Sequence, residues 1–456
     1  MQRTHIIETK DKVGQNVELF GWVNTRRDHG KLIFIDLRDR SGVVQVVFNN
    51  DEQAQKLRSE WVVHITGLVK ARPEKMINPD TPTGRVEIQP EALEILSEAA
   101  TPPFPLETDG MEISEENRMQ YRYLDLRRAR MQKNIVLRHR VTKLIRDYLD
   151  QEGFYEIETP ILTKSTPEGA RDYVVPSRLY HGKFYALPQS PQQYKQLLMV
   201  AGFEKYFQIA RCFRDEDTRG DRQPEFTQLD LEMSFVERED VMALNEALLI
   251  EIVKKLAPEK KIQQIPFPRL SYKEAMEKYG IDRPDLREDK NDPNLLAFCW
   301  VVDFPFFEKN KEGQWTFTHN PFSAPVKEHE EWLESEKNIG EILTSQYDVV
   351  LNGFEIGGGS IRNHKPELLK TVLRIIVVEN IEQNFGHMLE AFSFGAPPHG
   401  GIAWGLDRLM TVLANEPNIR EVITFPKTGD ARDLMMHSPS DLDEKQLKEL
   451  HLQIKK

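Results

Sequence analysis

The segment 213–235, FRDEDTRGDRQPEFTQLDLEMSF, holds the highest density of side chains that could act on a charged substrate. It reads as two strands joined by an arginine-rich polar loop. In the second strand Gln228, Asp230 and Glu232 alternate with apolar residues, so one face of this strand is polar and must look into a cleft or into solvent. Taken alone, the segment could also be a charged hairpin on the surface.

Two further segments favour a cleft over a surface hairpin. The run GAPPHGGIAWGLDRLMTVL (395–413) places a glycine-rich turn before an apolar helix, with Arg408 just inside the helix. The run FYEIETPILTKSTPEGARDY (154–173) ends a strand at Pro160. In chain order, the segments 154–173, 213–235 and 395–413 resemble motifs 1, 2 and 3 of class II aminoacyl-tRNA synthetases, centred on Pro160, Arg214 and Arg408. Along nearly its whole length the chain resembles the aspartyl members of that class.

The resemblance implies a reaction and a set of residues. The α-carboxylate of an amino acid attacks the α-phosphate of ATP, and the aminoacyl group then passes to the 3′ end of a tRNA. Fixed cations and in-line positioning would supply most of the catalysis. By resemblance Arg214 bridges the α-phosphate and the carboxylate, and Arg408 holds the γ-phosphate. The other residues implied at the nucleotide are Glu216, Gln223, Phe226, Glu355, Gly405 and Asp407.

A Mg²⁺ ion should accompany ATP, and the segment YDVVLNGFEIGGGSIR (347–362) offers carboxylates for it. Its Asn-Gly pair predicts a type I′ hairpin turn. That turn places Asp348 opposite Gly357 and leaves Asp348 and Glu355 on the same face. Two carboxylates there could hold Mg²⁺ while phosphates and water fill the remaining positions.

Aspartate presents two carboxylates and one ammonium group. By resemblance Lys195 and Arg362 receive the side-chain carboxylate, and bidentate arginine binding suits that planar group. The remaining residues implied at aspartate are Glu168, Ser190, Gln192, Arg214, Asp230 and His319, of which Glu168 and Asp230 would face the ammonium group. An asparaginyl enzyme of the same subclass, or a tRNA-binding relative without catalysis, stays open as an alternative. A lysyl enzyme would need acids where the two cations stand.

The segment 26–48 resembles the anticodon-binding part of the bacterial-type enzyme. Single-stranded bases are recognised on such domains by stacking and by hydrogen bonds to base edges. By resemblance Phe34 stacks, while Arg27, Gln45 and Glu87 contact base edges; Phe34 could instead be a core residue. His29 and Met76 match positions linked to the choice between the aspartate and asparagine tRNAs, so the enzyme is expected to charge both.

The elements that must position these residues fall into an α+β fold. Five short strands, near 17–23, 32–37, 43–48, 61–72 and 85–88, predict an N-terminal OB-fold barrel over 1–100. A proline-rich stretch marks a linker over 101–118. The class II catalytic domain, an antiparallel sheet flanked by helices, should fill 119–456, with the family's usual inserted domain reduced to a short loop near 287–294. A basic helical tail is expected over 443–456.

Bulk composition sets the remaining expectations. The net charge of −12 speaks weakly against nucleic acid, although clustered basic residues outweigh such a total. Two cysteines, Cys212 and Cys299, are too few and too far apart for a structural zinc site. No run of 18 apolar residues and no signal peptide were found, which favours a cytoplasmic enzyme without a membrane partner. The first motif builds the subunit interface in this class, so a homodimer is expected.

Overall fold

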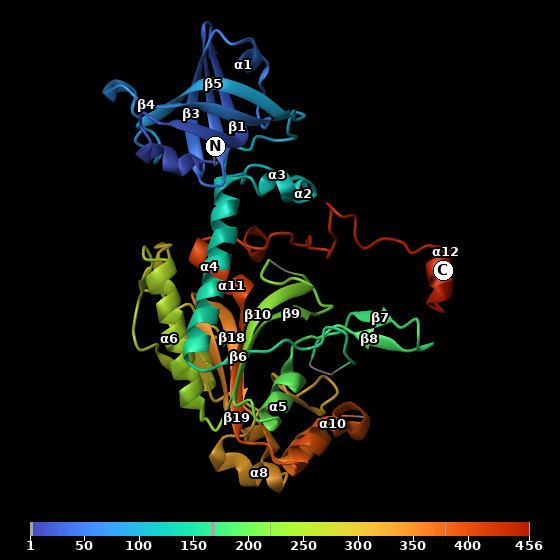
Figure 1. The fold of residues 1–456 in the computed structure, drawn as a ribbon. Coiled ribbons are helices and arrows are strands. Elements are labelled where there is room, and N and C mark those ends of the chain that lie inside the picture. Colours follow the sequence, from blue (N-terminus) through green and yellow to red (C-terminus); the bar gives the residue numbers. More distant parts are fainter. Residues whose placement is uncertain (1–2, 166–168, 219, 379, 456) are drawn as a thin grey trace. The chain divides into compact units, whose positions relative to one another are not determined.

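The computed structural model describes residues 3–165, 169–218, 220–378 and 380–455. The chain divides into two compact units, Met1–Ile113 and Ser114–Lys456 (Figure 1). The division falls inside the proline-rich stretch 101–118. No helix in the described ranges is both long and apolar enough to cross a membrane.

The first unit is a closed five-stranded barrel, which confirms the OB-fold expected from the sequence. Its strands run in the order β1-β2-β3-β5-β4. Alternate residues such as Ile33 and Ile35 are fully buried in the barrel, while Phe34 between them points outward and is half-buried. The elements are β1 (Asn16–His29), β2 (Leu32–Asp39), β3 (Gly42–Asn49), α1 (Glu52–Lys56), β4 (Val62–Ala71) and β5 (Val86–Ser97).

The second unit is built on an eight-stranded sheet in the order β12-β14-β17-β18-β19-β10-β9-β6. Its centre is antiparallel, as expected, and each edge adds one parallel pair, β12 with β14 and β6 with β9. The strands are β6 (Tyr155–Glu156), β9 (Lys205–Phe213), β10 (Glu225–Ser234), β12 (Arg269–Ser271), β14 (Phe298–Val302), β17 (Gln346–Leu351), β18 (Phe354–Ile361) and β19 (His399–Gly405). Short two-stranded pairs are β7 (Val174–Pro176) with β8 (Phe184–Ala186), β11 (Lys261–Ile262) with β13 (Leu295–Leu296), and β15 (Phe307–Lys309) with β16 (Trp315–Phe317).

Helices cover one face of this sheet. Leu229 and Leu231 of β10 pack in the main core with apolar residues of α4, α6 and α11 (Figure 1). The polar residues that alternate with them therefore face the other side, where a cleft opens. The helices are α2 (Glu115–Gln120), α3 (Arg122–Asp125), α4 (Ala129–Gln151), α5 (Gln192–Val200), α6 (Arg238–Leu256), α7 (Tyr272–Tyr279), α8 (Glu330–Glu334), α9 (Pro366–Ile375), α10 (Ile381–Ser393), α11 (Leu406–Ala414) and α12 (Glu444–Glu449).

Two elements are shorter than the sequence suggested. The strand expected over 154–160 is regular only at Tyr155–Glu156, because β6 lies at the edge of the sheet and pairs on one side with β9. The C-terminal helix expected over 443–456 is limited to Glu444–Glu449. Helix α4 ends at Gln151, and Gly153, which follows it, has a φ of 81°.

Candidate active site

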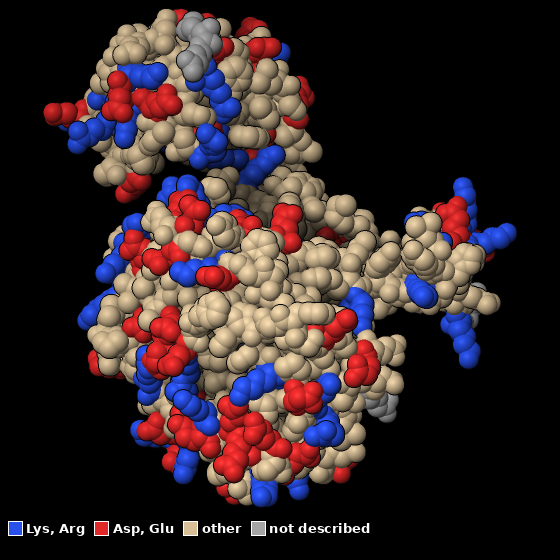
Figure 2. Space-filling view, turned by 60° about the horizontal axis from the view of Figure 1, so that its bottom comes forward, with Lys and Arg blue, Asp and Glu red and all other residues tan. Residues whose placement is uncertain are grey.

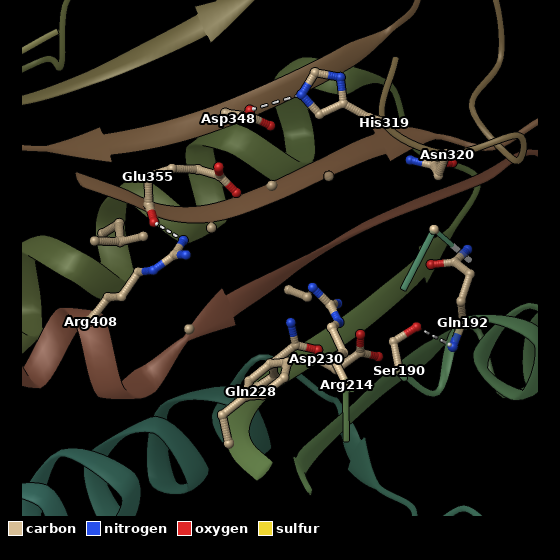
Figure 3. Close-up of a pocket in the computed structure, with 18 of the residues that line it drawn as sticks. Ser190, Gln192, Arg214, Gln228, Asp230, His319, Asn320, Asp348, Glu355 and Arg408 are labelled. Atoms are coloured by element: carbon tan, nitrogen blue, oxygen red, sulfur yellow. Dashed lines mark hydrogen bonds and ion pairs between the residues drawn. The ribbon is translucent and has the colours of Figure 1, made fainter. Parts of the chain in front are cut away.

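A cleft of about 360 Å³ lies on the open face of the eight-stranded sheet. Its walls bring together residues from all three motif segments and from the hairpin that carries the two carboxylates (Figure 3). The predicted site residues on its walls are Ser190, Gln192, Lys195, Arg214, Glu216, Gln223, Phe226, Asp230, His319, Asp348, Glu355, Arg362, Gly405, Asp407 and Arg408. Glu168, which was predicted to face the ammonium group, lies outside the described residues.

Two buried cations and two buried acids form the floor at one end of the cleft. Lys195 Nζ lies 2.9 Å from Asp230 Oδ2 and 3.2 Å from Glu232 Oε2. The Arg362 guanidinium meets Glu232 in a bidentate pair, with Nε 2.9 Å and Nη2 3.1 Å from its oxygens. Both cations that were predicted to receive the substrate side chain are therefore fixed in place before any substrate arrives.

The two acids of this floor differ in their proton affinity. Burial raises the pKa of Asp230, and Lys195 offsets that rise only in part. Burial would also raise the pKa of Glu232, but Arg362 and Lys195 together hold it at about 2. Asp230 Oδ1 is buried without a hydrogen-bond partner among the described residues. An ammonium group of a ligand would supply the missing donor.

Glycine makes room for this buried carboxylate. A Cβ built on Gly401 of β19 would lie 2.1 Å from Glu232 Oε2 and equally close to the Leu231 carbonyl. Any side chain at position 401 would therefore displace either the acid or strand β10. Glycine is therefore needed at position 401, opposite Glu232, for the acid to keep its place between Lys195 and Arg362.

Helix α5 presents further polar groups to the same end. The Gln192 backbone amide donates to Ser190 Oγ at 3.3 Å, and the Gln192 side chain donates to Gln196 at 2.9 Å. Gln196 in turn contacts His399 at 3.1 Å. Ser190 and Gln192 point into the cleft beside Asp230 in Figure 3.

The arginines expected at ATP are Arg214, which lies close to Asp230 and Ser190, and Arg408, which lies at the far end of the cleft (Figure 3). The Arg214 guanidinium lies over the Phe226 ring at 5.1 Å, a cation–π contact. Arg408 donates from Nη1 to the Glu355 carbonyl at 2.9 Å, and its Nη2 lies 3.5 Å from Asp221 Oδ2. Both arginines line the cleft, so a polyphosphate bound there could meet two cations.

Some residues implied at ATP already hold protein partners. Gln223 exchanges two hydrogen bonds with the backbone of Lys427, at 2.7 and 3.1 Å. Glu216 accepts from Arg222 at 3.2 Å, and both lie on the cleft wall. Gly405 ends the pairing of β19 with β10, directly before α11 begins. These contacts within the protein shape the part of the cleft where ATP is expected. Direct contacts of these residues with ATP stay a prediction.

The carboxylate hairpin differs from its predicted register by one residue. Asp348 pairs with Gly358, and the expected pairing with Gly357 is wrong, because a β-bulge shifts the register between Val349 and Val350. The two acids nevertheless converge: a Cβ on Gly358 would lie 2.7 Å from Asp348 Oδ1 and 3.8 Å from Glu355 Oε1. Both side chains point into the cleft (Figure 3).

The electrostatics of this corner favour a cation. Burial, and then the nearby charge of Glu355, raise the pKa of Asp348 well above its usual range. His319 Nε2 lies 3.8 Å from Asp348 Oδ2, and burial lowers the pKa of its imidazole. The described residues hold no cluster of three or more His, Cys, Asp or Glu suited to a metal. A cation here would therefore take its other ligands from phosphate and water, as Mg²⁺ commonly does.

The predicted anticodon residues form one connected patch on the barrel. The Arg27 guanidinium lies 6.0 Å from the centre of the Phe34 ring and donates to Gln45 at 3.4 Å. Gln45 donates to Glu87 at 3.2 Å. His29 is exposed and meets the Phe34 ring edge-on at 5.5 Å. The outward orientation of Phe34 rejects the alternative that it is a core residue.

Comparison with known proteins identifies the family. Residues 114–429 match the family described as tRNA synthetases class II (D, K and N), and residues 17–96 match the OB-fold nucleic acid binding domain. The chain belongs to the class II tRNA synthetases. Similar relatives are the aspartate–tRNA(Asp/Asn) ligase of Thermoanaerobacter sp. strain X514, 42% identical with 100% of this chain and 98% of the relative covered, and the aspartate–tRNA ligase of Macrococcus caseolyticus, 41% identical with 98% and 97% covered.

Solved structures agree on the fold of this synthetase. The asparaginyl-tRNA synthetase of Pyrococcus horikoshii superposes with a TM-score of 0.76 at 24% identity, covering 94% of this chain and 98% of that one. The aspartyl-tRNA synthetase of Entamoeba histolytica gives 0.73 at 24% identity, covering 93% and 91%. The match to the Thermoanaerobacter relative extends over 592 positions, whereas this synthetase has 456 residues, so the relative contains segments that this chain lacks.

Sequence reasoning missed two residues that shape the site of this synthetase. Glu232 was noted for its polar face, but its role as the shared partner of Lys195 and Arg362 was not foreseen. Its period-two spacing from Asp230 was the available signal. Arg138 of α4, which contacts Asp407 at 2.5 Å, was not singled out at all, because nothing in a helix sequence tells which distant carboxylate it meets.

Proposed function

We propose that this synthetase is an aspartate–tRNA ligase that forms aspartyl-adenylate from aspartate and ATP and transfers the aspartyl group to tRNA. The observation that carries the proposal is the pair of buried cations, Lys195 and Arg362, on the floor of the cleft beside Asp230. A dicarboxylate with one ammonium group meets opposite charges at this floor. Both relatives named above carry aspartate–tRNA ligase in their names, which supports the same choice.

In this proposal the residues of the cleft position and stabilise charge. Lys195 and Arg362 bind the side-chain carboxylate, and Asp230 accepts the ammonium group. Arg214 neutralises the charge that grows on the α-phosphate, Arg408 holds the far end of the triphosphate, and the adenine stacks on Phe226. A substrate carboxylate is already ionised at neutral pH, so this first step needs no general base.

A divalent metal fits the corner formed by Asp348 and Glu355. The convergence of the buried Asp348 and the half-buried Glu355 around Gly358 is the feature that suits it. We assign Mg²⁺ because hard carboxylate and phosphate oxygens are its preferred ligands. When bound, Mg²⁺ supplies charge neutralisation to the phosphates. The protein's share is to hold the two carboxylates on neighbouring strands of one hairpin. A cytoplasmic location accords with this role.

ATP–pyrophosphate exchange with aspartate, asparagine and lysine offered separately tests the assignment. Exchange that depends on aspartate supports it, because the neutral amide of asparagine would leave the buried cations without a matching charge. Exchange driven by asparagine would establish the asparaginyl alternative. Absence of exchange with all three, in protein that still binds the tRNA, would identify a relative without catalysis.

We infer that the protein acts as a homodimer. Apolar side chains are exposed around the first motif and the β7–β8 hairpin: Tyr155 is 63% exposed, Leu162 53% and Leu179 83%. The arm that carries this hairpin, at the right in Figures 1 and 2, is mostly uncharged at its base and carries charged side chains at its tip. Among the described residues, strand β6 also pairs on one edge only, and a second copy would cover the other edge.

Light scattering at micromolar concentration should therefore give twice the mass of the chain. Leu162→Glu should shift the protein to monomers and lower its exchange rate, because it places a charge in the proposed apolar contact. Met276→Glu is the matched control, since Met276 is 39% exposed on the surface of α7. A fully active monomer of the unchanged protein would refute the inference.

We further propose that both the aspartate and the asparagine tRNA are charged. The two anticodons differ in their third base, and His29 lies beside the Phe34 ring that would stack on the anticodon. An imidazole can offer a hydrogen bond to either base. Met76, the second position linked to this choice, is 64% exposed in the turn Glu74–Met76 between β4 and β5.

The expected result is that both purified tRNAs are aspartylated and that His29→Leu lowers charging of the asparagine tRNA by up to about tenfold, the value of one hydrogen bond. Transcripts of a single tRNA body with the third anticodon base exchanged would assign the effect to that base. A strong preference for the aspartate tRNA that His29→Leu leaves unchanged would end this proposal.

A further inference from the structure

Polar residues spaced four apart along α4 hold the segment that follows the third motif. Arg130 contacts Glu416 at 2.5 Å and Glu421 at 2.9 Å. Asn134 donates to the Glu416 carboxylate at 2.6 Å and to the Glu421 carbonyl at 3.1 Å. Residues four apart share one helix face, so Arg138 continues the same stripe.

Arg138 reaches the motif itself. Its Nη1 lies 2.5 Å from Asp407 Oδ1, and the Asp407 side chain is 5% exposed. Asp407 stands in the first turn of α11, directly before Arg408. Without the guanidinium of Arg138, the carboxylate of Asp407 would be left buried without its charge partner, which is unfavourable.

The other oxygen of Asp407 holds strand β10. Asp407 Oδ2 accepts from the Thr227 backbone amide at 3.2 Å. Pairing of β10 with β19 ends at Gln228 and Gly405, because the chain turns into α11 at the next residue. The side chain of Asp407 thus adds one hydrogen bond beyond the last backbone pair of β10 and β19. The donor is Thr227, the residue that follows Phe226.

We propose that Arg138 is a positioning residue for the nucleotide half of the cleft and acts through Asp407. Arg138 orients the Asp407 carboxylate, and that carboxylate holds the backbone of β10 at Thr227. The position of Phe226 on β10 is thereby fixed relative to Arg408 on α11. Arg138 and Asp407 therefore set the spacing between Phe226 and Arg408. The inference rests on the proposed function to the extent that this half of the cleft binds ATP.

The test measures nucleotide binding separately from aspartate. Arg138→Gln should raise the Kd of a non-hydrolysable ATP analogue with Mg²⁺, and the KM for ATP in exchange, by about tenfold, since small misplacements are costly in such sites. The KM for aspartate should change less than about twofold, as the aspartate floor is held by other contacts. Arg138→Lys, which keeps one charged donor, should recover most of the loss.

Arg130→Gln is the matched control, because it removes an arginine from the same face of α4 without touching Asp407. Arg130→Gln should lower the melting temperature of the protein without weakening its binding of the ATP analogue. The proposal would be overturned if Arg138→Gln weakened the binding of ATP and aspartate equally, or if Arg130→Gln weakened ATP binding as much as Arg138→Gln does. Either result would show that α4 merely stabilises the unit.

If Arg138→Gln does not fold, a second variant tests the same contact. Asp407→Asn keeps one acceptor, which can serve Thr227 or Arg138 but not both, so analogue affinity should fall severalfold. Unchanged affinity in Asp407→Asn would overturn the proposal. Because analogue binding requires no amino acid, loss of aspartate-dependent exchange in the unchanged protein would count against the proposed function alone.

Discussion

Arg214→Ala is expected to slow aspartate-dependent ATP–pyrophosphate exchange by about two orders of magnitude or more, the usual cost of losing one preorganised charge contact at a reacting group. Arg214 lies over Phe226 in the cleft, and in the proposed mechanism it meets both the α-phosphate and the substrate carboxylate. Its effect should therefore appear chiefly in the rate at saturating substrate. Steady-state exchange at varied ATP and aspartate separates this rate from either KM.

Arg211→Ala provides the comparison for that variant. Arg211 lies three residues earlier, at the end of β9, and makes a half-exposed pair with Glu225 at 3.2 Å. Exposed pairs of this kind contribute little, so exchange should stay within about twofold of the unchanged protein. Near-normal exchange in Arg214→Ala would refute the proposed mechanism, and equal losses in both variants would point to a general disturbance of the motif 2 hairpin.

Arg362→Gln should remove most of the affinity for aspartate while leaving ATP binding largely intact. The variant takes away one of two cations for the substrate carboxylate and leaves Glu232 with Lys195 alone. Breaking a buried pair in this way typically costs about 3–5 kcal/mol, so a fall in the free energy of unfolding is expected too. Calorimetric titration with aspartate and with an ATP analogue, together with denaturant unfolding, measures both effects.

Lys365→Gln is a suitable control, three residues away in the sequence. Lys365 pairs with Glu330 on the surface and is half-exposed, so its loss should cost under about 1 kcal/mol and leave both ligands bound. If Arg362→Gln weakened ATP and aspartate equally, Arg362 would be a structural residue. Lys195→Gln should reproduce the selective loss of aspartate, because Lys195 supplies the second cation.

Local patterns were sufficient to predict the barrel and the polar face of β10. Alternation of Gln228, Asp230 and Glu232 with leucines follows from the two-residue period of a strand, and the structure places the apolar set in the core. These features depend on neighbours in one element, which the sequence displays directly. The orientation of Phe34 was left open by the sequence, because Ile33 and Ile35 beside it are also apolar, and the structure turns its side chain outward.

Contacts between distant elements could not be predicted in this way. The register at Asp348 shifted because a bulge depends on how both strands of the hairpin pack, beyond the turn residues alone. The pair Arg138–Asp407 joins residues 269 positions apart, and many arginines of α4 were equally plausible partners. The first-motif strand is short because, among the described residues, it pairs on one edge only, with β9.

The close approach of Gly401 to Glu232 bears on how such an enzyme can change its substrate. The charges that we propose to select the amino acid share their space with the backbone of the central sheet. A larger side chain at 232, or an acid moved toward β19, cannot be accommodated by trimming a neighbour, because Gly401 opposite already lacks a side chain. Redesign of this pocket for another amino acid therefore has to alter strand spacing and charge together, which closes most single-substitution routes to a new specificity.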